Sequence, residues 1–211
     1  MRHGKVLSLV GLVFWTAAAA ARAQDQPQEA ADPTTPKGML VMLARATQAG
    51  DSAAIRNLFH YDSPLEQKLV EAIAEHVEAR TKIRNAAVKA FGQEVADQIA
   101  SNTIDEDRIR TAEVKVEGDK ATVRIPNDPQ ILSLVKVDGQ WKMSVSPMTK
   151  GRSKDEVEQQ LEQMKILAGI VRETAGELEQ GKYTTPQQLD DAIRGKRARA
   201  MAPKPSPTTQ Q

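Results

Sequence analysis

Apolar and polar residues alternate along residues 112–145, and this alternation predicts β-strands. In the first half of the stretch, every second residue is apolar: Ala112, Val114, Val116, Ala121, Val123 and Ile125. In the second half, the apolar residues are Ile131, Leu132, Leu134, Val135, Val137, Trp141, Met143 and Val145. A period of two gives a strand one face toward a core and one face toward solvent. We therefore predict four strands within residues 112–145.

Turn residues divide these strands where a meander requires them. Gly118-Asp119 and Asp138-Gly139 are two-residue turns that accept positive φ, and Asp-Gly is a strong hairpin signal. Residues 126–129 (Pro-Asn-Asp-Pro) form a loop, because proline has no N–H to donate to a strand ladder. The sequence thus predicts an antiparallel four-stranded meander that the rest of the chain must cover.

Helical spacing of apolar residues predicts helices on both sides of the meander. The expected ranges are 39–49, 52–59, 64–91, 95–99, 153–180 and 185–193. The long helix of residues 64–91 begins with Ser63-Pro64-x-Glu66, in which Ser caps the helix and Glu completes a capping box. We predict an α+β fold, with N-terminal helices packed against a curved antiparallel meander and a helical extension at the C-terminus.

Seven apolar residues of the helix at 153–180 alternate spacings of four and three, which is typical of a helix that packs along another helix. These seam residues are Val157, Leu161, Met164, Ala168, Val171, Ala175 and Leu178. Their partner is either the long helix of residues 65–91 in the same chain or the same helix of a second copy, which would make a homodimer. Gly169 and Gly176 lie seven residues apart. Because glycine is unfavourable inside a helix, we expect another backbone to pack closely there.

Residues 1–23 have the three parts of a secretory signal peptide. The stretch starts with basic residues, continues with an apolar run at residues 6–20, and ends with Ala-Arg-Ala before Gln24. The alternative is an uncleaved N-terminal anchor, although the run is shorter than the roughly 20 residues of a membrane helix. We expect cleavage between Ala23 and Gln24 and a mature chain in a bacterial periplasm or outside the cell.

Composition narrows the classes of function. The chain has no cysteine, which excludes disulfides and lipid attachment at a lipobox. Residues 24–193 carry 21 Lys and Arg against 28 Asp and Glu, a net charge of about −7. An acidic body with 3% aromatic residues is a poor nucleic-acid binder. The basic residues after it, Arg194, Lys196, Arg197, Arg199 and Lys204, form either a solubilising tail or a contact with anionic envelope surfaces.

These signals divide the chain into five segments. The expected segments are a signal peptide at 1–23, a flexible linker at 24–36, an α+β domain at 37–148, a C-terminal helical extension at 149–197 and a disordered tail at 198–211.

Three short patterns follow one another in residues 37–146. They are Ala49-Gly50-Asp51 at a helix end, Gly118-Asp119-Lys120-Ala121-Thr122-Val123 across a turn, and Asp138-Gly139-Gln140-Trp141-Lys142 leading into the last strand. In this order they resemble the NTF2-like superfamily of SnoaL-like and cystatin-related domains. The resemblance implies a sheet curled around the long helix into a cone with a pocket at its open end. The superfamily includes isomerases, dehydratases, transport adaptors and exported proteins without an assigned activity, so it implies little about function.

Two groups of residues are candidates for a site at such a cone. His60, Tyr61 and Asp62 bring together an imidazole, a phenol and a carboxylate, which suits proton transfer at the cone mouth; the alternative is a polar turn between helices. The apolar pocket candidates are Trp141, Met143, Val123, Val135 and Phe59. Trp141 is either a ligand-stacking ring or a core residue. His76 is expected on a solvated helix face.

The sequence predicts no metal site and no cofactor, because no ligand spacing, P-loop, nucleophile elbow or dinucleotide turn is present. Our leading hypothesis is an exported, non-enzymatic domain that binds an apolar small molecule or an envelope protein. One alternative is a SnoaL-like isomerase or hydrolase that uses His60, Tyr61 or Asp62. Another is a purely structural interaction module of the envelope.

Overall fold

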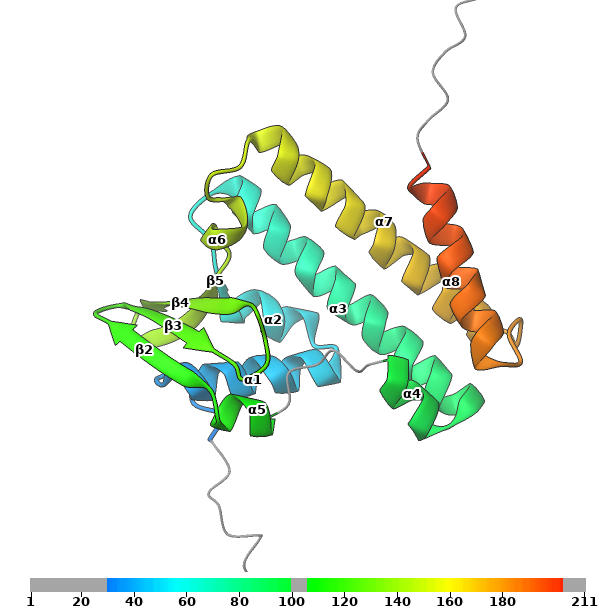
Figure 1. The fold of residues 1–211 in the computed structure, drawn as a ribbon, viewed down its shortest axis with the longest axis horizontal. Helices are drawn as coiled ribbons and strands as arrows, with labels where there is room; N and C mark the ends of the chain where they lie inside the picture. The colour runs from blue at the N-terminus through cyan, green and yellow to red at the C-terminus, as the bar shows by residue number, and fades with distance from the viewer. Residues whose placement is uncertain (1–29, 100–105, 203–211) are drawn as a thin grey trace, which may run out of the picture.

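The computed structural model describes residues 30–99 and 106–202, and in these residues the chain forms an α+β fold (Figure 1). A small sheet and short helices form one end, from which two long helices extend side by side. The α+β class is therefore confirmed. The predicted signal peptide, residues 24–29 of the predicted linker and residues 203–211 lie outside the described residues.

The sheet has five strands in the order β1-β5-β4-β3-β2. Their bounds are β1 Phe59–His60, β2 Glu113–Glu117, β3 Lys120–Arg124, β4 Ile131–Val137 and β5 Gln140–Ser144. The strands β2 to β5 pair antiparallel in chain order, whereas β1 pairs parallel with β5. The prediction of a purely antiparallel four-stranded sheet is wrong in this respect. Two residues are too few to show an alternation, so the sequence assigned Phe59 to the end of a helix and His60 to the turn that follows.

Both predicted hairpin turns form. Gly118 has φ +60° between β2 and β3, and Asp138 and Gly139 have φ +50° and +80° between β4 and β5. Positive φ at both central residues gives the Asp138-Gly139 turn type I′ geometry, whose twist matches that of the flanking strands. The turns fix the register, and Val114 therefore pairs with Val123 and Leu134 with Met143.

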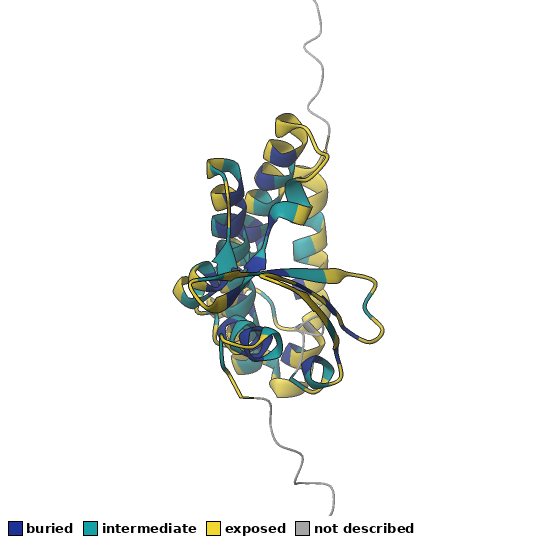
Figure 2. Cartoon of the chain, turned by 90° about the vertical axis from the view of Figure 1, so that its left-hand side faces the viewer, coloured by how far each residue is buried: buried dark blue, intermediate teal, exposed yellow. Residues whose placement is uncertain are grey.

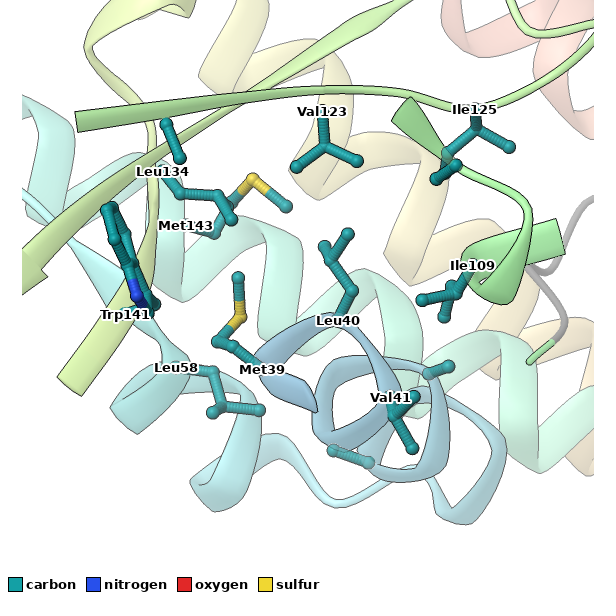
Figure 3. Close-up of a cluster of buried hydrophobic side chains, with 14 of the residues drawn as sticks. Met39, Leu40, Val41, Leu58, Ile109, Val123, Ile125, Leu134, Trp141 and Met143 are labelled. Carbon is teal, nitrogen blue, oxygen red and sulfur yellow. The ribbon is translucent and has the colours of Figure 1, made fainter. Parts of the chain in front are cut away.

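Three helices lie next to one face of the sheet: α1 (Pro36–Ala49), α2 (Ser52–Leu58) and α5 (Glu106–Arg110). Met39 and Leu40 of α1 project toward the inner face of the sheet, where Val123 and Leu134 meet them (Figure 3). This packing forms the main core. The sheet is open rather than closed into a cone, and α1 and α2 are the main cover of its inner face.

The long helix α3 (Pro64–Phe91) leaves this core and packs along α7 (Lys154–Glu179). Leu69 near the start of α3 packs with Leu161 near the start of α7, whereas Ile83 near the end of α3 packs with Leu178 near the end of α7. The two helices therefore run parallel, as Figure 1 also shows. The short helix α6 (Ser146–Thr149) brings the chain from β5 to the start of α7.

The seam of α7 faces α3 of the same chain. Five of its seven residues are buried and the other two, Met164 and Val171, are partly buried. The intrachain alternative is therefore correct, and these residues are not available for the homodimer. The expected close backbone approach at Gly169 and Gly176 is wrong, because a Cβ built on either glycine meets no atom of another described element within 4 Å.

Two shorter helices complete the fold at the far end of the long pair. They are α4 (Gln93–Ile99), which follows α3, and α8 (Pro186–Ala200), which packs against α7. Buried positions gather where the helices face one another and where the sheet faces α1 (Figure 2). Because α8 continues to Ala200, the tail predicted from residue 198 begins at least three residues too early.

Candidate functional site

The polar turn between β1 and α3 is held by a chain of hydrogen bonds. His60 Nε2 lies 2.9 Å from Asp62 Oδ1, and the hydroxyl of Ser146 lies 3.4 Å from Asp62 Oδ2. The structure thus brings His60 and Asp62 together, while Tyr61 beside them is 41% exposed. Asp62 stands between the imidazole and the hydroxyl. His60 therefore has no contact through which to take the proton of Ser146, and the order is not that of a hydrolytic triad.

Glu66 joins this turn to α6. Its carboxylate accepts the Asp62 N–H at 2.7 Å and the Thr149 hydroxyl at 2.8 Å, and its own N–H donates to Ser63 Oγ. Glu66 is 6% exposed, so these bonds satisfy a buried carboxylate at the N-terminus of α3, where the helix dipole favours negative charge. The geometry of this cluster fits helix capping and the joining of α6 to α3.

The apolar pocket candidates occupy two different faces of the sheet. Trp141, Met143 and Val123 are 4%, 8% and 0% exposed and belong to the main core, with Phe59 packed at its edge. Val135 pairs with Lys120 and Lys142 on the opposite face, because successive residues of a strand alternate. The five residues therefore do not line one pocket.

Trp141 is a core residue with fixed neighbours. Its ring lies beside Met39 and Leu58 in Figure 3, and the Lys136 ammonium sits 5.8 Å from the ring centroid. The backbone N–H of Trp141 donates to Pro33 O at 2.6 Å. Residues 32–35, predicted as part of a flexible linker, thus form a turn that caps α1 and occupies the β5 edge beyond the short β1.

His76 is the residue whose environment the sequence reasoning missed. It follows Ala72 by four positions and precedes Ala79 by three, so it lies on the face of α3 that packs against α7. Its Nδ1 atom is buried and has no hydrogen-bond partner among the described residues. Burial lowers the pKa of His76, and the nearby Arg80 lowers it further. Spacings of four and three along α3 place His76 between Ala72 and Ala79, and this pattern could have predicted its burial from the sequence.

A network of charges fastens α8 to α7. Lys196 contacts Glu173 and Glu177, and the Tyr183 hydroxyl donates to Glu177 at 2.5 Å. These bonds, that of Lys196 first, lower the pKa of Glu177 to about 2. The network accounts for Lys196, which the sequence placed in a basic tail.

A polar groove of about 450 Å³ lies at the start of α7. Its lining residues are Arg152, Glu156, Gln159, Gln160 and Gln163. None of them is a predicted pocket residue. Arg152 donates to Gln160 and to the Met148 carbonyl, so part of the polar lining is already bonded within the chain.

One edge of the sheet is formed by β2. Strand order places it at the end of the sheet, and no described residue pairs with its outer side. Val116 is 52% exposed, and the side chains of Lys115 and Glu117 are 76% and 68% exposed. An unpaired strand edge is a template for another strand.

Residues 30–99 and 106–202 contain no group of His, Asp and Glu arranged to hold a metal ion. Within the same ranges, no helix is both long and apolar enough to cross a membrane. Comparisons with protein-family models, with curated proteins and with solved structures give no match.

Proposed function

We propose that the chain is an exported, non-enzymatic NTF2-like interaction domain that binds a partner protein through the β2 edge of its sheet. The observation that carries this proposal is the open edge itself, with the exposed side chains of Lys115, Val116 and Glu117. Strand addition at such an edge supplies affinity through backbone hydrogen bonds and specificity through alternate side chains.

Two features favour a protein partner, the first over a small apolar ligand and the second over an enzyme. The inward residues Val123, Leu134 and Met143 are in the packed core, where they support the sheet against α1. The polar residues His60 and Asp62 are bonded to each other at a helix cap. The enzyme alternative uses these polar residues, and turnover that disappears in a His60→Ala variant would support that alternative.

Photo-crosslinking in the cell envelope tests the proposal. A photoreactive residue at position 116 should give one defined protein adduct, whereas the same residue at the exposed Gln187 of α8 should not. The adduct should disappear when Val114→Pro blocks the same edge. Equal adducts at both positions, or a lipid-like molecule bound one-to-one in native mass spectrometry, would contradict a dedicated protein edge.

A further inference from the structure

The residues of β2 alternate in charge as Glu113-Val114-Lys115-Val116-Glu117. We propose that the partner at this edge is a second copy of the chain, with the two β2 strands antiparallel and Val116 of one copy opposite Val116 of the other. The inference rests on the proposed function and names its partner.

The backbone of β2 has bonding groups available at the required positions. Glu117 and Lys120 flank a two-residue turn, and such a flanking pair exchanges both backbone hydrogen bonds. Because hydrogen-bonded and non-bonded pairs alternate, the N–H and C=O of Val116 point away from β3, as do those of Val114. Two copies can therefore exchange bonds at Val116 without breaking a bond to β3.

Charge selects the register. If the two strands overlapped completely, Lys115 would face Lys115 and Glu113 would face Glu117, and like charges directly opposite are destabilising. A shift of two residues centres the pair on Val116 and places Lys115 of each copy opposite Glu117 of the other. Glu113 then comes level with Asp119, which lies in the turn beyond the end of β2. The same shift covers the Val116 side chain, which is 52% exposed in one chain.

The opposite shift, centred on Val114, pairs Glu113 with Lys115 but requires Ala112 to join the new ladder. Ala112 is 5% exposed, and its N–H donates to Ile109 O at 3.0 Å. In the register centred on Val116, Val114 faces Gly118 instead, and a Cβ built on Gly118 meets no atom within 4 Å. The end of β2 next to the turn is therefore the end that can pair with a second copy.

Sedimentation equilibrium of the purified mature protein, over about 1–500 μM because the paired area is small, tests this register. Wild type should show a monomer–dimer equilibrium. Lys115 Nζ lies 2.7 Å from Glu117 Oε1 of the same strand, so each single variant breaks that ion pair as well as the pairs between copies. Lys115→Glu alone and Glu117→Lys alone should each weaken dimerisation about tenfold, because each change turns the two attractive pairs between copies into repulsive ones. The double variant Lys115→Glu/Glu117→Lys should restore the wild-type dissociation constant to within about twofold, because opposite charges face each other again.

Two further variants complete the test. Val116→Pro removes the central N–H and should leave a folded monomer. If proline disturbs the strand, Val116→Lys should also leave a folded monomer, because it places two lysines opposite each other. Lys142→Glu, on β5, should leave dimerisation unchanged. The double variant Glu113→Lys/Lys115→Glu tests the register centred on Val114. If it restores the wild-type dissociation constant and Lys115→Glu/Glu117→Lys does not, the strands pair in that register and the one centred on Val116 is wrong.

A wild type that is monomeric at every concentration would overturn the dimer. The proposed function would survive that result if position 116 still gave an adduct with a different protein, and it would fall if position 116 gave none.

Discussion

Replacing His76 by leucine should make the protein more stable. Nδ1 of His76 is buried without a hydrogen-bond partner in the described part of the chain, and such an atom costs about 1–3 kcal/mol. Leucine has a similar volume and no polar atom, and it would lie on the α3 face that contacts α7, between Ala72 and Ala79. We expect the free energy of unfolding to rise by about 1–3 kcal/mol, which corresponds to a melting temperature about 2–12 °C higher.

The gain should depend on pH in a defined direction. The pKa of His76 is lowered in the folded protein, so the unfolded chain binds the proton more tightly. As pH falls below about 6.5, the wild type therefore loses stability that the His76→Leu variant keeps, by at most about 1.4 kcal/mol per pH unit. Thermal and urea unfolding of both proteins between pH 5 and 8 measures this difference.

A matched control separates the buried imidazole from the other histidine of the described residues. His60 lies at the polar turn beside Asp62, and His60→Leu should not give the same gain. A His76→Leu variant that is less stable than wild type would show that Nδ1 has a partner, such as a water molecule. A stability difference that stays constant with pH would show that His76 does not titrate in this range.

Three further predictions follow from particular contacts. Gly50→Ala should destabilise the protein by more than the roughly 1–2 kcal/mol expected for positive φ alone, because a Cβ at this position lies 2.7 Å from Thr81 Cβ. Gly118→Ala is the control, because Gly118 has a similar φ but no close neighbour among the described residues. Urea unfolding of both variants separates the steric cost from the backbone cost. Gly169→Ala should stabilise α7 by about 1 kcal/mol, because a Cβ at this position meets no atom of another described element within 4 Å. The gain should appear as a higher urea midpoint. A lower midpoint would indicate that another molecule or segment packs against this side of α7. Glu177→Gln should lower the free energy of unfolding above about pH 4.5, and the difference from wild type should vanish as pH falls toward 2. Urea unfolding at several pH values measures this difference. A difference that stays constant with pH would contradict the lowered pKa of Glu177.

Local patterns predict the elements whose physical cause is local. The strands β2 to β5 and their turns follow from alternation and from Gly and Asp at positive φ, and Ser63 caps α3 as expected. The pairing of β1 with β5 is a tertiary effect. Phe59 lies opposite Met143 because α2 ends there beside the sheet, and nothing in residues 59–60 alone encodes this.

The candidate site shows the same division. The proximity of His60 to Asp62 follows from two positions of sequence separation, whereas the contacts of Asp62 with Ser146 and of Glu66 with Thr149 join residues more than eighty positions apart. Because of those distant contacts, residues that suggested proton transfer instead cap the start of α3 and bind it to α6. Val135 was placed in a pocket from its hydrophobicity, and the register with Lys120 and Lys142 assigns it to the opposite face.

Apolar residues that recur every four positions along the long helix α3 pack against two different parts of the chain. A spacing of four advances 40° around a helix at each step, so Leu65, Leu69, Ile73 and Val77 do not form a straight line. Leu65 and Leu69 pack with α7, whereas Ile73 and Val77 pack against the core under the sheet.

The face of α3 that follows α7 along its whole length alternates spacings of four and three. Its residues are Leu65, Leu69, Ala72, His76, Ala79, Ile83 and Ala86. Three alanines and a histidine make this heptad weakly hydrophobic, whereas the facing residues of α7 are mostly larger and give a clear signal. The α7 pattern therefore predicted a partner helix more clearly than the α3 pattern did. If the parallel pair depends on this weak face, Ala79→Asp should separate α7 from α3 and lower the unfolding free energy by several kcal/mol, since Ala79 is 1% exposed. An equal loss at the exposed Lys82→Asp would instead indicate a general effect of charge on α3.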